Sequence, residues 1–303
     1  MRPSVVEQLA LRYVPGEGPV SVERIGSGLV NETYRVARGP GRYSMRVPAQ
    51  HPVDLGLDRA WECRVLERAG AAGLAPVVEC CEPRCGILVS RWVEGGVWTS
   101  EQAAQPENIE NIAQLARRIH SLPLPEAART MRLEAWIAHY RQALARHSVD
   151  AHPALRAALE ARLATLARLP ASAPVLCHSD LHVQNLIAAD HGLVLLDWEY
   201  AHVSEPFWDL AGWAANNDLG ANSRHLLLAG YLGREPEAQE AVRLQLLLWL
   251  YDYVCLLWSE LHLTLGAGAA GEPVGDAIRA RAQSLTSRLH GDSGGRGGQV
   301  PAH

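Results

Sequence analysis

The chain has 303 residues, 48% of them hydrophobic, so it is long enough to bury a substantial core in one large domain or in two. Its formal net charge is −5 and no basic cluster occurs, which leaves no electrostatic footprint for nucleic acid or an anionic membrane. The longest apolar stretch, residues 244–258, is interrupted by Gln245 and Asp252 and is too short to span a bilayer, so we expect a buried helix there. No charged-then-apolar signal opens the chain, and a cytoplasmic location is expected.

Two strand-like segments near the start of the chain are joined by small residues. Gly26, Ser27 and Gly28 lie between these segments within residues 23–36, and residues 43–47 are predicted to form a third strand. Glycines let backbone amides come close to a phosphate, which bulky side chains prevent. Two nearby glycines also suit an ordinary hairpin turn, so the pattern alone leaves both readings open.

The segment that follows combines an amphipathic helix with a further strand. Residues 61–67 have the helical period, with Trp61, Val65 and Leu66 on the inward face. Residues 86–91 are strand-like and lead to a pair of glycines at positions 95 and 96. Such a pattern suits a hinge between two lobes, although any strand that ends near two glycines looks similar.

Helices are expected to dominate the rest of the chain. Apolar residues recur with helical period over residues 109–119 before Pro123 ends the element. We predict further helices near three segments, which are residues 156–169, 222–232 and 237–265. The glycine-rich residues 291–303 are expected to be a disordered tail.

The cysteines show no spacing typical of a metal site. The six cysteines contain no C-x-x-C pair and no Cys/His pairing of the zinc type. We therefore expect Cys80, Cys81 and Cys85 to be small buried apolar residues.

The most informative residues are His178, Asp180 and Asn185, at the spacing H-x-D-x4-N. Asp197 follows twelve residues after Asn185 (197 minus 185), at the end of an apolar run. Transfer of a phosphoryl group to a hydroxyl needs a carboxylate to accept the proton and oxygen ligands to hold magnesium. Asp180 suits the first task, and Asn185 with Asp197 the second. Apolar runs typical of short buried strands flank these positions, which makes a chance match in a surface loop the less favoured explanation.

Residues 176–186, 196–201 and 207–211 resemble the aminoglycoside phosphotransferase and choline kinase superfamily of small-molecule kinases. The Asp-Trp-Glu-Tyr-Ala sequence at 197–201 is similar to the choline/ethanolamine and thiamine kinase branch. The resemblance follows the order of motifs from Gly26 to Asp209.

The resemblance implies an α+β, bilobal, protein-kinase-like fold. Residues 1–94 would form a nucleotide-binding N-lobe with a small antiparallel sheet and one helix. Residues 95–290 would form a larger, mostly helical C-lobe with the catalytic and acceptor-binding residues. Within this fold Asp180 would be the catalytic base, and Asn185 and Asp197 would bind Mg²⁺.

The nucleotide-binding residues implied by the resemblance lie in the first hundred positions. Gly26, Ser27 and Gly28 match a short phosphate loop, and Asn31 would tie that loop down or approach the substrate. The chain contains no lysine, so Arg46 stands where a kinase usually has the lysine that holds the phosphates. Arginine is always charged and binds phosphate through a planar fork.

Three further residues complete the predicted nucleotide site. Glu62 is the expected partner of Arg46, with a solvated helix carboxylate as the alternative. Trp92 and Val93 belong to the hinge, where the adenine edge would pair with backbone groups. These residues together predict ATP and Mg²⁺ as the cofactors.

Supporting roles are expected for His178 and Asp209. His178 is expected to bond the loop backbone rather than transfer a proton, and Asp209 would brace the catalytic loop. Glu199 would either face the acceptor or cap a turn, and the sequence favours neither.

A late helix carries the predicted acceptor contacts. Trp249, Tyr253 and Trp258 could hold a cationic head group by cation–π attraction, with Asp252 supplying charge. The alternative is that these rings are core residues. We therefore expect an ATP- and Mg-dependent kinase of a cationic amino alcohol, such as choline or ethanolamine, or of thiamine. An aminoglycoside or amino-sugar kinase and a catalytically silent pseudokinase are the alternatives. The expected partner is a small-molecule acceptor, without nucleic acid or membrane, and the protein is expected to be a monomer or homodimer.

Overall fold

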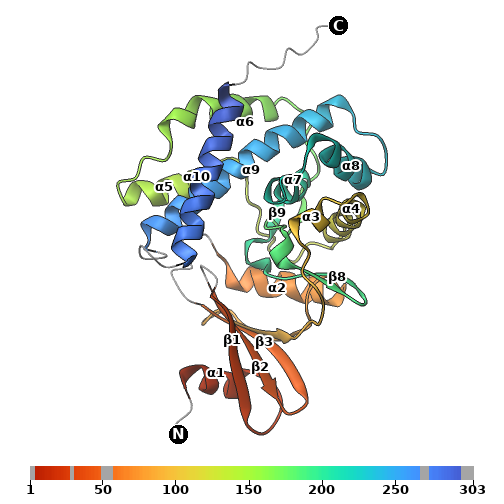
Figure 1. Ribbon diagram of the computed structural model, residues 1–303, viewed down its shortest axis with the longest axis vertical. Helices are drawn as coiled ribbons and strands as arrows, with labels where there is room; N and C mark the ends of the chain where they lie inside the picture. Colours follow the sequence, from red (N-terminus) through yellow and green to blue (C-terminus); the bar gives the residue numbers. More distant parts are fainter. Residues whose placement is uncertain (1–3, 28–30, 49–56, 267–272, 295–303) are drawn as a thin grey trace. The chain divides into compact units, whose positions relative to one another are not determined.

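The computed structural model describes four stretches of the chain, residues 4–27, 31–48, 57–266 and 273–294. The chain divides into two compact units, each made of two separate segments. Figure 1 labels helices and strands and colours them along the sequence. The first unit contains Met1–Thr130 and Pro174–Pro236, and the second contains Met131–Ala173 and Glu237–His303. The first unit thus holds all of the predicted N-lobe and part of the predicted C-lobe, and a lobe boundary at residue 94 stays a prediction.

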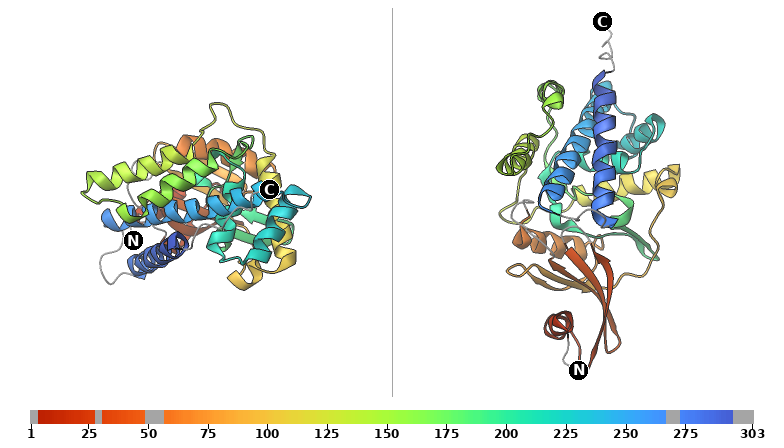
Figure 2. Two further views of the ribbon diagram at one scale, coloured as in Figure 1. Left: turned by 90° about the horizontal axis from the view of Figure 1, so that it is seen from above. Right: turned by 60° about the vertical axis from the view of Figure 1, so that its left-hand side comes forward.

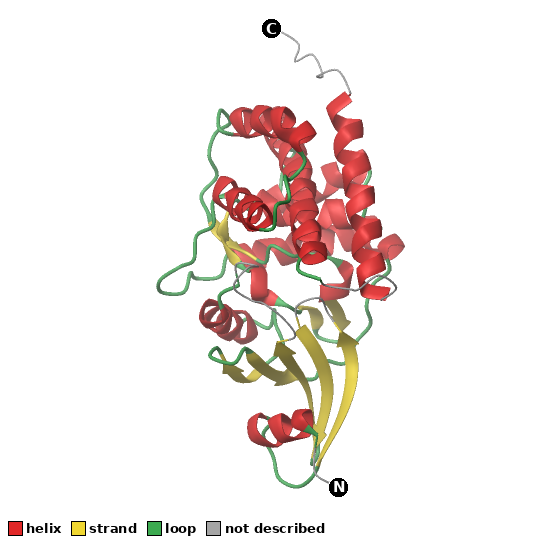
Figure 3. Ribbon diagram, turned by 90° about the vertical axis from the view of Figure 1, so that its left-hand side faces the viewer, coloured by secondary structure: helices red, strands yellow, loops and turns green. Residues whose placement is uncertain are grey.

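A five-stranded antiparallel sheet opens the first unit and is drawn in yellow in Figure 3. Its order is β1-β2-β3-β5-β4. The strands are β1 (Val20–Ser27), β2 (Asn31–Arg38), β3 (Gly41–Pro48), β4 (Val78–Glu82) and β5 (Ile87–Arg91). Alternate residues such as Tyr34, Val36, Met45 and Val89 are buried in one apolar cluster, so the period of two in the sequence decides which face is covered.

Two helices, rather than the one predicted, accompany this sheet. Helix α1 (Val5–Tyr13) adds Ala10 to the apolar cluster beside the sheet. Helix α2 (Arg59–Ala71) is capped at its N-terminus by Asp58, whose side chain accepts a hydrogen bond from the backbone N–H of Trp61 at 2.9 Å. Trp61, Val65 and Leu66 are buried, as the helical period predicts.

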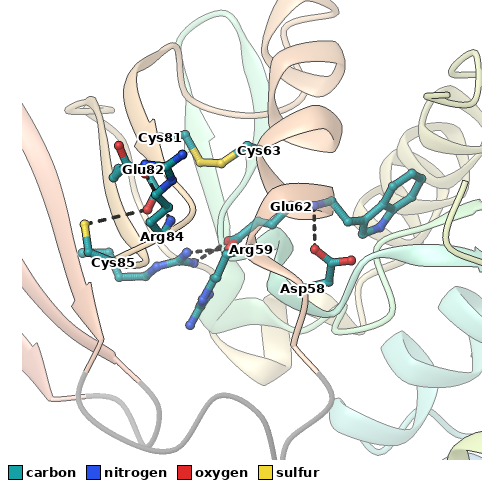
Figure 4. Close-up of a disulfide and its surroundings, with 10 residues drawn as sticks. Asp58, Arg59, Glu62, Cys63, Cys81, Glu82, Arg84 and Cys85 are labelled. Atoms are coloured by element: carbon teal, nitrogen blue, oxygen red, sulfur yellow. Dashed lines mark hydrogen bonds and ion pairs between the residues drawn. A yellow bond between two sulfur atoms is a disulfide. The ribbon is translucent and has the colours of Figure 1, made fainter. Parts of the chain in front are cut away.

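The cysteines of this region differ from the prediction of small buried apolar residues. Cys63 of α2 forms a disulfide with Cys81 of β4 (Figure 4). Cys85 is exposed and Cys80 is only partly buried. Sequence spacing could not show the pairing, because the two cysteines lie on different elements that meet only in the folded chain.

The remainder of the first unit contains two short antiparallel sheets of two strands each, β6 with β9 and β7 with β8. Its elements are α3 (Ser100–Ala103), α4 (Pro106–His120), β6 (Val175–Cys177), η2 (Val183–Asn185), β7 (Leu186–Ala189), β8 (Gly192–Leu195), η3 (Trp198–Tyr200), β9 (His202–Ser204), α7 (Phe207–Asn216) and α8 (Ala221–Leu232). Gly96 exchanges backbone hydrogen bonds of 3.1 and 2.8 Å with Ala188, which joins the segment after β5 to β7. A Cβ at Gly95 would lie 2.5 Å from the Ala188 carbonyl oxygen, so this close approach requires glycine.

The second unit is helical. Its elements are α5 (Leu133–Arg146), η1 (Pro153–Leu155), α6 (Arg156–Leu166), α9 (Ala238–Thr264) and α10 (Pro273–Gly294). Helices α5, α6 and α10 all contact α9, and Figure 2 shows α9 and α10 side by side in blue. The predicted disordered tail at residues 291–303 overlaps α10, because this helix continues through residues 291–294 despite their glycines. Residues 295–303 lie outside the part of the chain that the structure describes.

Helix α9 is long and apolar enough to cross a membrane by length and composition. However, 61% of its most apolar window is buried within the structure. Burial of this extent is typical of a core helix, and the predicted buried helix over residues 244–258 lies within it.

Candidate active site

The loop after β6 carries Asp180 and starts from a buried anchor. Leu176, Cys177 and Leu181 are at most 1% exposed, so apolar residues fix the loop on both sides of the aspartate. Ser179, between them, has a positive φ of 70°. A left-handed conformation is costly for a non-glycine residue and persists only where surrounding contacts hold it.

His178 supplies one of these contacts with a neutral ring. Its Nε2 donates to the carbonyl oxygen of Leu196 at 2.8 Å, and its Nδ1 accepts from the backbone N–H of Asp180 at 3.3 Å. Burial lowers the pKa of His178, in agreement with this neutral form. The ring therefore links the Asp180 loop to the segment before Asp197.

Asp209, at the start of α7, binds the backbone of the same loop. Its carboxylate accepts the backbone N–H groups of His178 at 2.9 Å and Ser179 at 2.7 Å. His120 of α4 lies 3.1 Å from the carboxylate through Nε2 and 2.9 Å from the Tyr231 hydroxyl through Nδ1. Burial alone would raise the pKa of Asp209, but the hydrogen bond and charge of His120 lower it below its usual value.

Asp180 and Asn185 are brought together by the turn at η2. Asn185 donates from Nδ2 to the Asp180 carboxylate at 2.9 Å and to the Asp180 carbonyl oxygen at 3.1 Å. The Asp180 side chain is 27% exposed, and His182 lies 3.3 Å from it. The amide thus orients the carboxylate while its own Oδ1 is the atom suited to bind a cation.

Asp197 joins this group through the backbone. The Leu196 N–H donates to the Asn185 carbonyl oxygen at 2.8 Å, so the two polar segments run side by side. Asp197 follows with φ 56°, a second left-handed non-glycine residue in the site. Its side chain is 37% exposed.

Arg46 and Glu62 form a buried bidentate ion pair. The two guanidinium nitrogens lie 2.6 and 2.7 Å from the two carboxylate oxygens. A third contact of 3.3 Å joins Arg46 to Asp197. Burial opposes both charges, yet each charge stabilises the other, so the pKa of Arg46 is raised and that of Glu62 is lowered.

A second arginine, Arg59, extends the network. It donates to Glu62 at 2.9 Å, to Glu199 at 2.7 Å and to the Asn31 side-chain oxygen at 3.0 Å. Asn31 in turn donates to Glu199 at 2.7 Å. Glu199 is 3% exposed and contacts the Asn31 and Arg59 side chains of this cluster.

The side chains around Asp197 have the oxygen ligands and the negative charge that a divalent cation needs. Burial and the Glu199 carboxylate raise the pKa of Asp197, although Arg46 opposes the shift and over a third of the side chain remains exposed. A cation would relieve this excess of carboxylate. Asp197 and Asn185 offer hard oxygen ligands of the kind that Mg²⁺ prefers.

The structure describes most of the other residues predicted to bind nucleotide, but their contacts do not test that role. Gly26 and Ser27 end β1 opposite Thr33 and Glu32 of β2, next to a bulge, whereas Gly28 lies outside the described residues. The Trp92 ring lies 4.3 Å from the Arg35 guanidinium. The backbone N–H of Trp92 donates to the carbonyl oxygen of Arg42. Val93 is partly buried. Their role at a hinge stays a prediction.

The predicted acceptor residues of α9 belong to the second unit. Trp249 and Tyr253 stack with 5.5 Å between ring centroids, and the Arg162 guanidinium lies 4.3 Å over Trp249. Asp252 pairs with Arg288 at 2.8 Å. Trp258 is partly buried and lies 4.1 Å from His262. Trp249 and Tyr253 thus have the surroundings of core residues, and a contact with an acceptor stays a prediction for all four.

Sequence reasoning missed Arg59, His120 and Tyr231. Arg59 lies three residues before Glu62, a spacing that places both on one helix face and could have indicated a shared partner. His120 and Tyr231 come from α4 and α8, and no local pattern connects them with Asp209.

A family model described as the phosphotransferase enzyme family (APH) matches residues 21–244. The chain belongs to this family. It is therefore a small-molecule kinase, a phosphotransferase with the α+β fold and the small antiparallel sheet that the resemblance implies, and this sheet has five strands. No curated protein sequence matches it.

Solved structures share this fold. Choline kinase LicA from Streptococcus pneumoniae is 22% identical with a TM-score of 0.77, over 95% of this chain and 98% of its own. A choline/ethanolamine kinase family protein from Mesorhizobium loti is 24% identical with a TM-score of 0.70, over 92% and 88%. The aminoglycoside kinase APH(2″), solved with GDP and kanamycin, is 16% identical with a TM-score of 0.65, over 94% and 97%. LicA has also been solved with AMP, and nucleotide use is a property of this group.

Proposed function

We propose that the protein transfers the γ-phosphoryl group of ATP, with Mg²⁺, to a hydroxyl of a small cationic amino alcohol such as choline or ethanolamine, or of thiamine. The observation that carries this proposal is the arrangement of Asp180, Asn185 and Asp197. Asp180 is hydrogen-bonded to Asn185, and Asn185 is joined to the Asp197 segment through the Leu196 N–H.

In this mechanism Asp180 accepts the proton of the acceptor hydroxyl as the oxygen attacks phosphorus. A carboxylate is a weak base for an alcohol, so orientation must supply much of the rate acceleration. The hydrogen bond from Asn185 and the loop anchored by His178 and Asp209 fix that orientation. Partial exposure of Asp180 leaves it accessible to an acceptor.

Asn185 and Asp197 would hold Mg²⁺, which when bound neutralises charge that develops on the phosphoryl oxygens. Arg46 would hold the nucleotide phosphates from its position on Glu62. Glu62 keeps the guanidinium in place, because a buried bidentate pair restricts its rotation.

The fold similarity supports a small cationic acceptor. It is higher for choline kinase LicA, with a TM-score of 0.77, and for the choline/ethanolamine kinase family protein, with 0.70, than for the aminoglycoside kinase, with 0.65. An aminoglycoside or amino-sugar acceptor is the alternative.

A cytoplasmic location is part of the proposal, together with a monomeric or homodimeric state and no nucleic-acid or membrane partner. The charge of −5 and the absence of a basic cluster in the sequence support the last point. In a reducing cytoplasm the Cys63–Cys81 disulfide would be exposed to thiol reductants.

The test is nucleotide consumption with Mg-ATP across choline, ethanolamine, thiamine, amino sugars and aminoglycosides, with Asp180→Ala as the control. Turnover with one cationic alcohol that disappears in the variant supports the proposal. Turnover only with aminoglycosides or amino sugars would contradict the proposed acceptor class. No nucleotide consumption with any compound of the panel would contradict the proposed activity.

A further inference from the structure

The cluster around Glu62 contains two guanidinium groups and three carboxylates. Arg46 and Arg59 carry the positive charges, and Glu62, Asp197 and Glu199 carry the negative ones. With all five ionised the cluster has a net charge of −1. Four of its members have side chains at most 9% exposed, so water screens their charges poorly, whereas Asp197 is 37% exposed.

Arg59 stands between two carboxylates that would otherwise compete for Arg46. The Oε2 atom of Glu62 lies 2.7 Å from Arg46 and 2.9 Å from Arg59. The Oε2 atom of Glu199 lies 2.7 Å from Arg59 but 3.6 Å from Arg46. Glu199 is therefore paired mainly with Arg59, and Arg46 keeps its bidentate contact with Glu62.

A lysine could not replace this contact set. The Arg59 fork uses Nη1 for the two carboxylates and Nη2 for the Asn31 side-chain oxygen at 3.0 Å. Asn31 then donates to Glu199, which closes a ring of hydrogen bonds between the start of β2, the start of α2 and η3. Figure 4 shows Arg59 and Glu62 on the same side of α2.

We propose that Arg59 is a positioning residue for the nucleotide-binding end of the site. By neutralising Glu199 it keeps Arg46 on Glu62 and leaves Asp197 as the carboxylate whose charge is available to a magnesium–nucleotide complex. This inference rests on the proposed function, because it assigns Arg59 to the same phosphoryl-transfer site.

Removal of Arg59 should have two consequences. Glu199 would lose its nearest cation, and Arg46 would then be drawn from Glu62 toward Glu199 and Asp197. The net charge of the cluster would change from −1 to −2. Removal of the Glu199 charge as well returns it to −1, so the paired substitution should restore part of what the single one loses.

The test is isothermal titration of Mg-ATP into the full-length protein. The variants are Arg59→Gln, Glu199→Gln, the double variant and the control Arg68→Gln, which lies nine residues further along the same helix. We expect Arg59→Gln to weaken Mg-ATP binding at least tenfold, the double variant to recover at least half of that loss on a logarithmic scale, and Arg68→Gln to bind as the parent protein does. Steady-state kinetics should show the loss in the KM for ATP rather than in the KM for the acceptor.

Arg59→Lys is the substitute variant if Arg59→Gln does not fold, because lysine keeps the positive charge but lacks the planar guanidinium group. We expect it to bind Mg-ATP less tightly than the parent and more tightly than any folded Arg59→Gln. Parent-like binding by the folded Arg59 variants, or a double variant no better than Arg59→Gln, would overturn the positioning role. Failure of the parent protein itself to bind Mg-ATP would instead overturn the proposed function.

Discussion

In the first unit, charged side chains share a buried cluster around Glu62, whereas in the second unit helix α9 buries mainly its own leucine and aromatic side chains. The contacts of this cluster join side chains from several elements, including β2, β3, α2 and η3. In the second unit, Asp252 of α9 forms an ion pair with Arg288 of α10.

This contrast shows why the two regions differ in how well residue identity predicts a role. A buried charge must have a partner, so a polar residue in the first cluster has few possible tasks. An aromatic residue such as Trp249 gains stability from burial alone, so its identity does not separate core from ligand contact. The following predictions test that difference between the units.

The largest expected effect is on catalysis in the first unit. Asp180→Asn keeps an acceptor for the Asn185 amide but removes the base, so we expect kcat to fall by a factor of about 10² to 10⁴. Initial rates with Mg-ATP and the best acceptor measure this, with thermal unfolding as the check on folding. Asp190→Asn is the matched control, because Asp190 is an exposed residue of the same unit. Equal rates in the parent and Asp180→Asn would remove Asp180 from the mechanism.

A second effect concerns the disulfide that links α2 to β4. Cys63 and Cys81 are 18 residues apart, and a closed loop of this length contributes about 3 kcal/mol by limiting the unfolded chain. We expect dithiothreitol, or Cys81→Ser, to lower the free energy of unfolding by about that amount in urea titrations. Cys85→Ser should retain the full response to reductant, since Cys85 is a free exposed thiol. A parent protein insensitive to reductant would contradict the contribution of this disulfide.

A third effect concerns the support of the catalytic loop. Asp209→Asn keeps one side-chain oxygen but removes the negative charge. The Asp209 carboxylate accepts two backbone N–H groups and contacts His120, so all three interactions should weaken. A charge-assisted hydrogen bond of this kind contributes about 2 kcal/mol, and the Asn amide keeps one oxygen that accepts a backbone N–H, so we expect a loss of at least about 2 kcal/mol in unfolding free energy. Chemical denaturation measures it. Unchanged stability would show that the neutral side chain supports the loop equally well.

The smallest effect belongs to the second unit and depends on pH. Burial lowers the pKa of His262 to about 4, against an ordinary value of 6.5. Between these values the unfolded chain binds the proton and the folded chain does not, so acidification favours unfolding. From pH 6.5 to 5.5 this costs about 1 kcal/mol.

The matching variant is His262→Gln, whose unfolding free energy should fall less over this pH interval than that of the parent. His290→Gln, at an exposed position of α10, is the control and should keep the parent slope. His202 is also buried with a pKa lowered to about 4, so part of the slope will remain in every variant. Identical slopes in the parent and His262→Gln would show that His262 is hydrated in the folded state.

Much of the first unit follows from local sequence pattern. Strands β1, β2, β3 and β5, and helix α2 with its inward Trp61, follow from short-range patterns, whereas β4 was not predicted. The family match confirms the fold class and the kinase assignment. The pairing of Arg46 with Glu62 was expected from the resemblance and is present in the structure.

Other features depend on contacts between residues that are distant in the chain. The Cys63–Cys81 disulfide, the His120 contact with Asp209 and the Arg59 contact with Glu199 each join separate elements. No local period or spacing encodes such contacts. The aromatic residues of α9 show a different limit, because the same residue types serve equally well in a core or against a cationic ligand.

The most direct test of the central claim is ³¹P nuclear magnetic resonance of the parent protein with Mg-ATP and each acceptor, with and without excess EDTA. We predict a new phosphate monoester signal on one small hydroxyl compound, formed in equal amount to ADP and abolished by EDTA. ATP that stays intact across the acceptors, or that yields only inorganic phosphate, would contradict the assignment of this site to phosphoryl transfer.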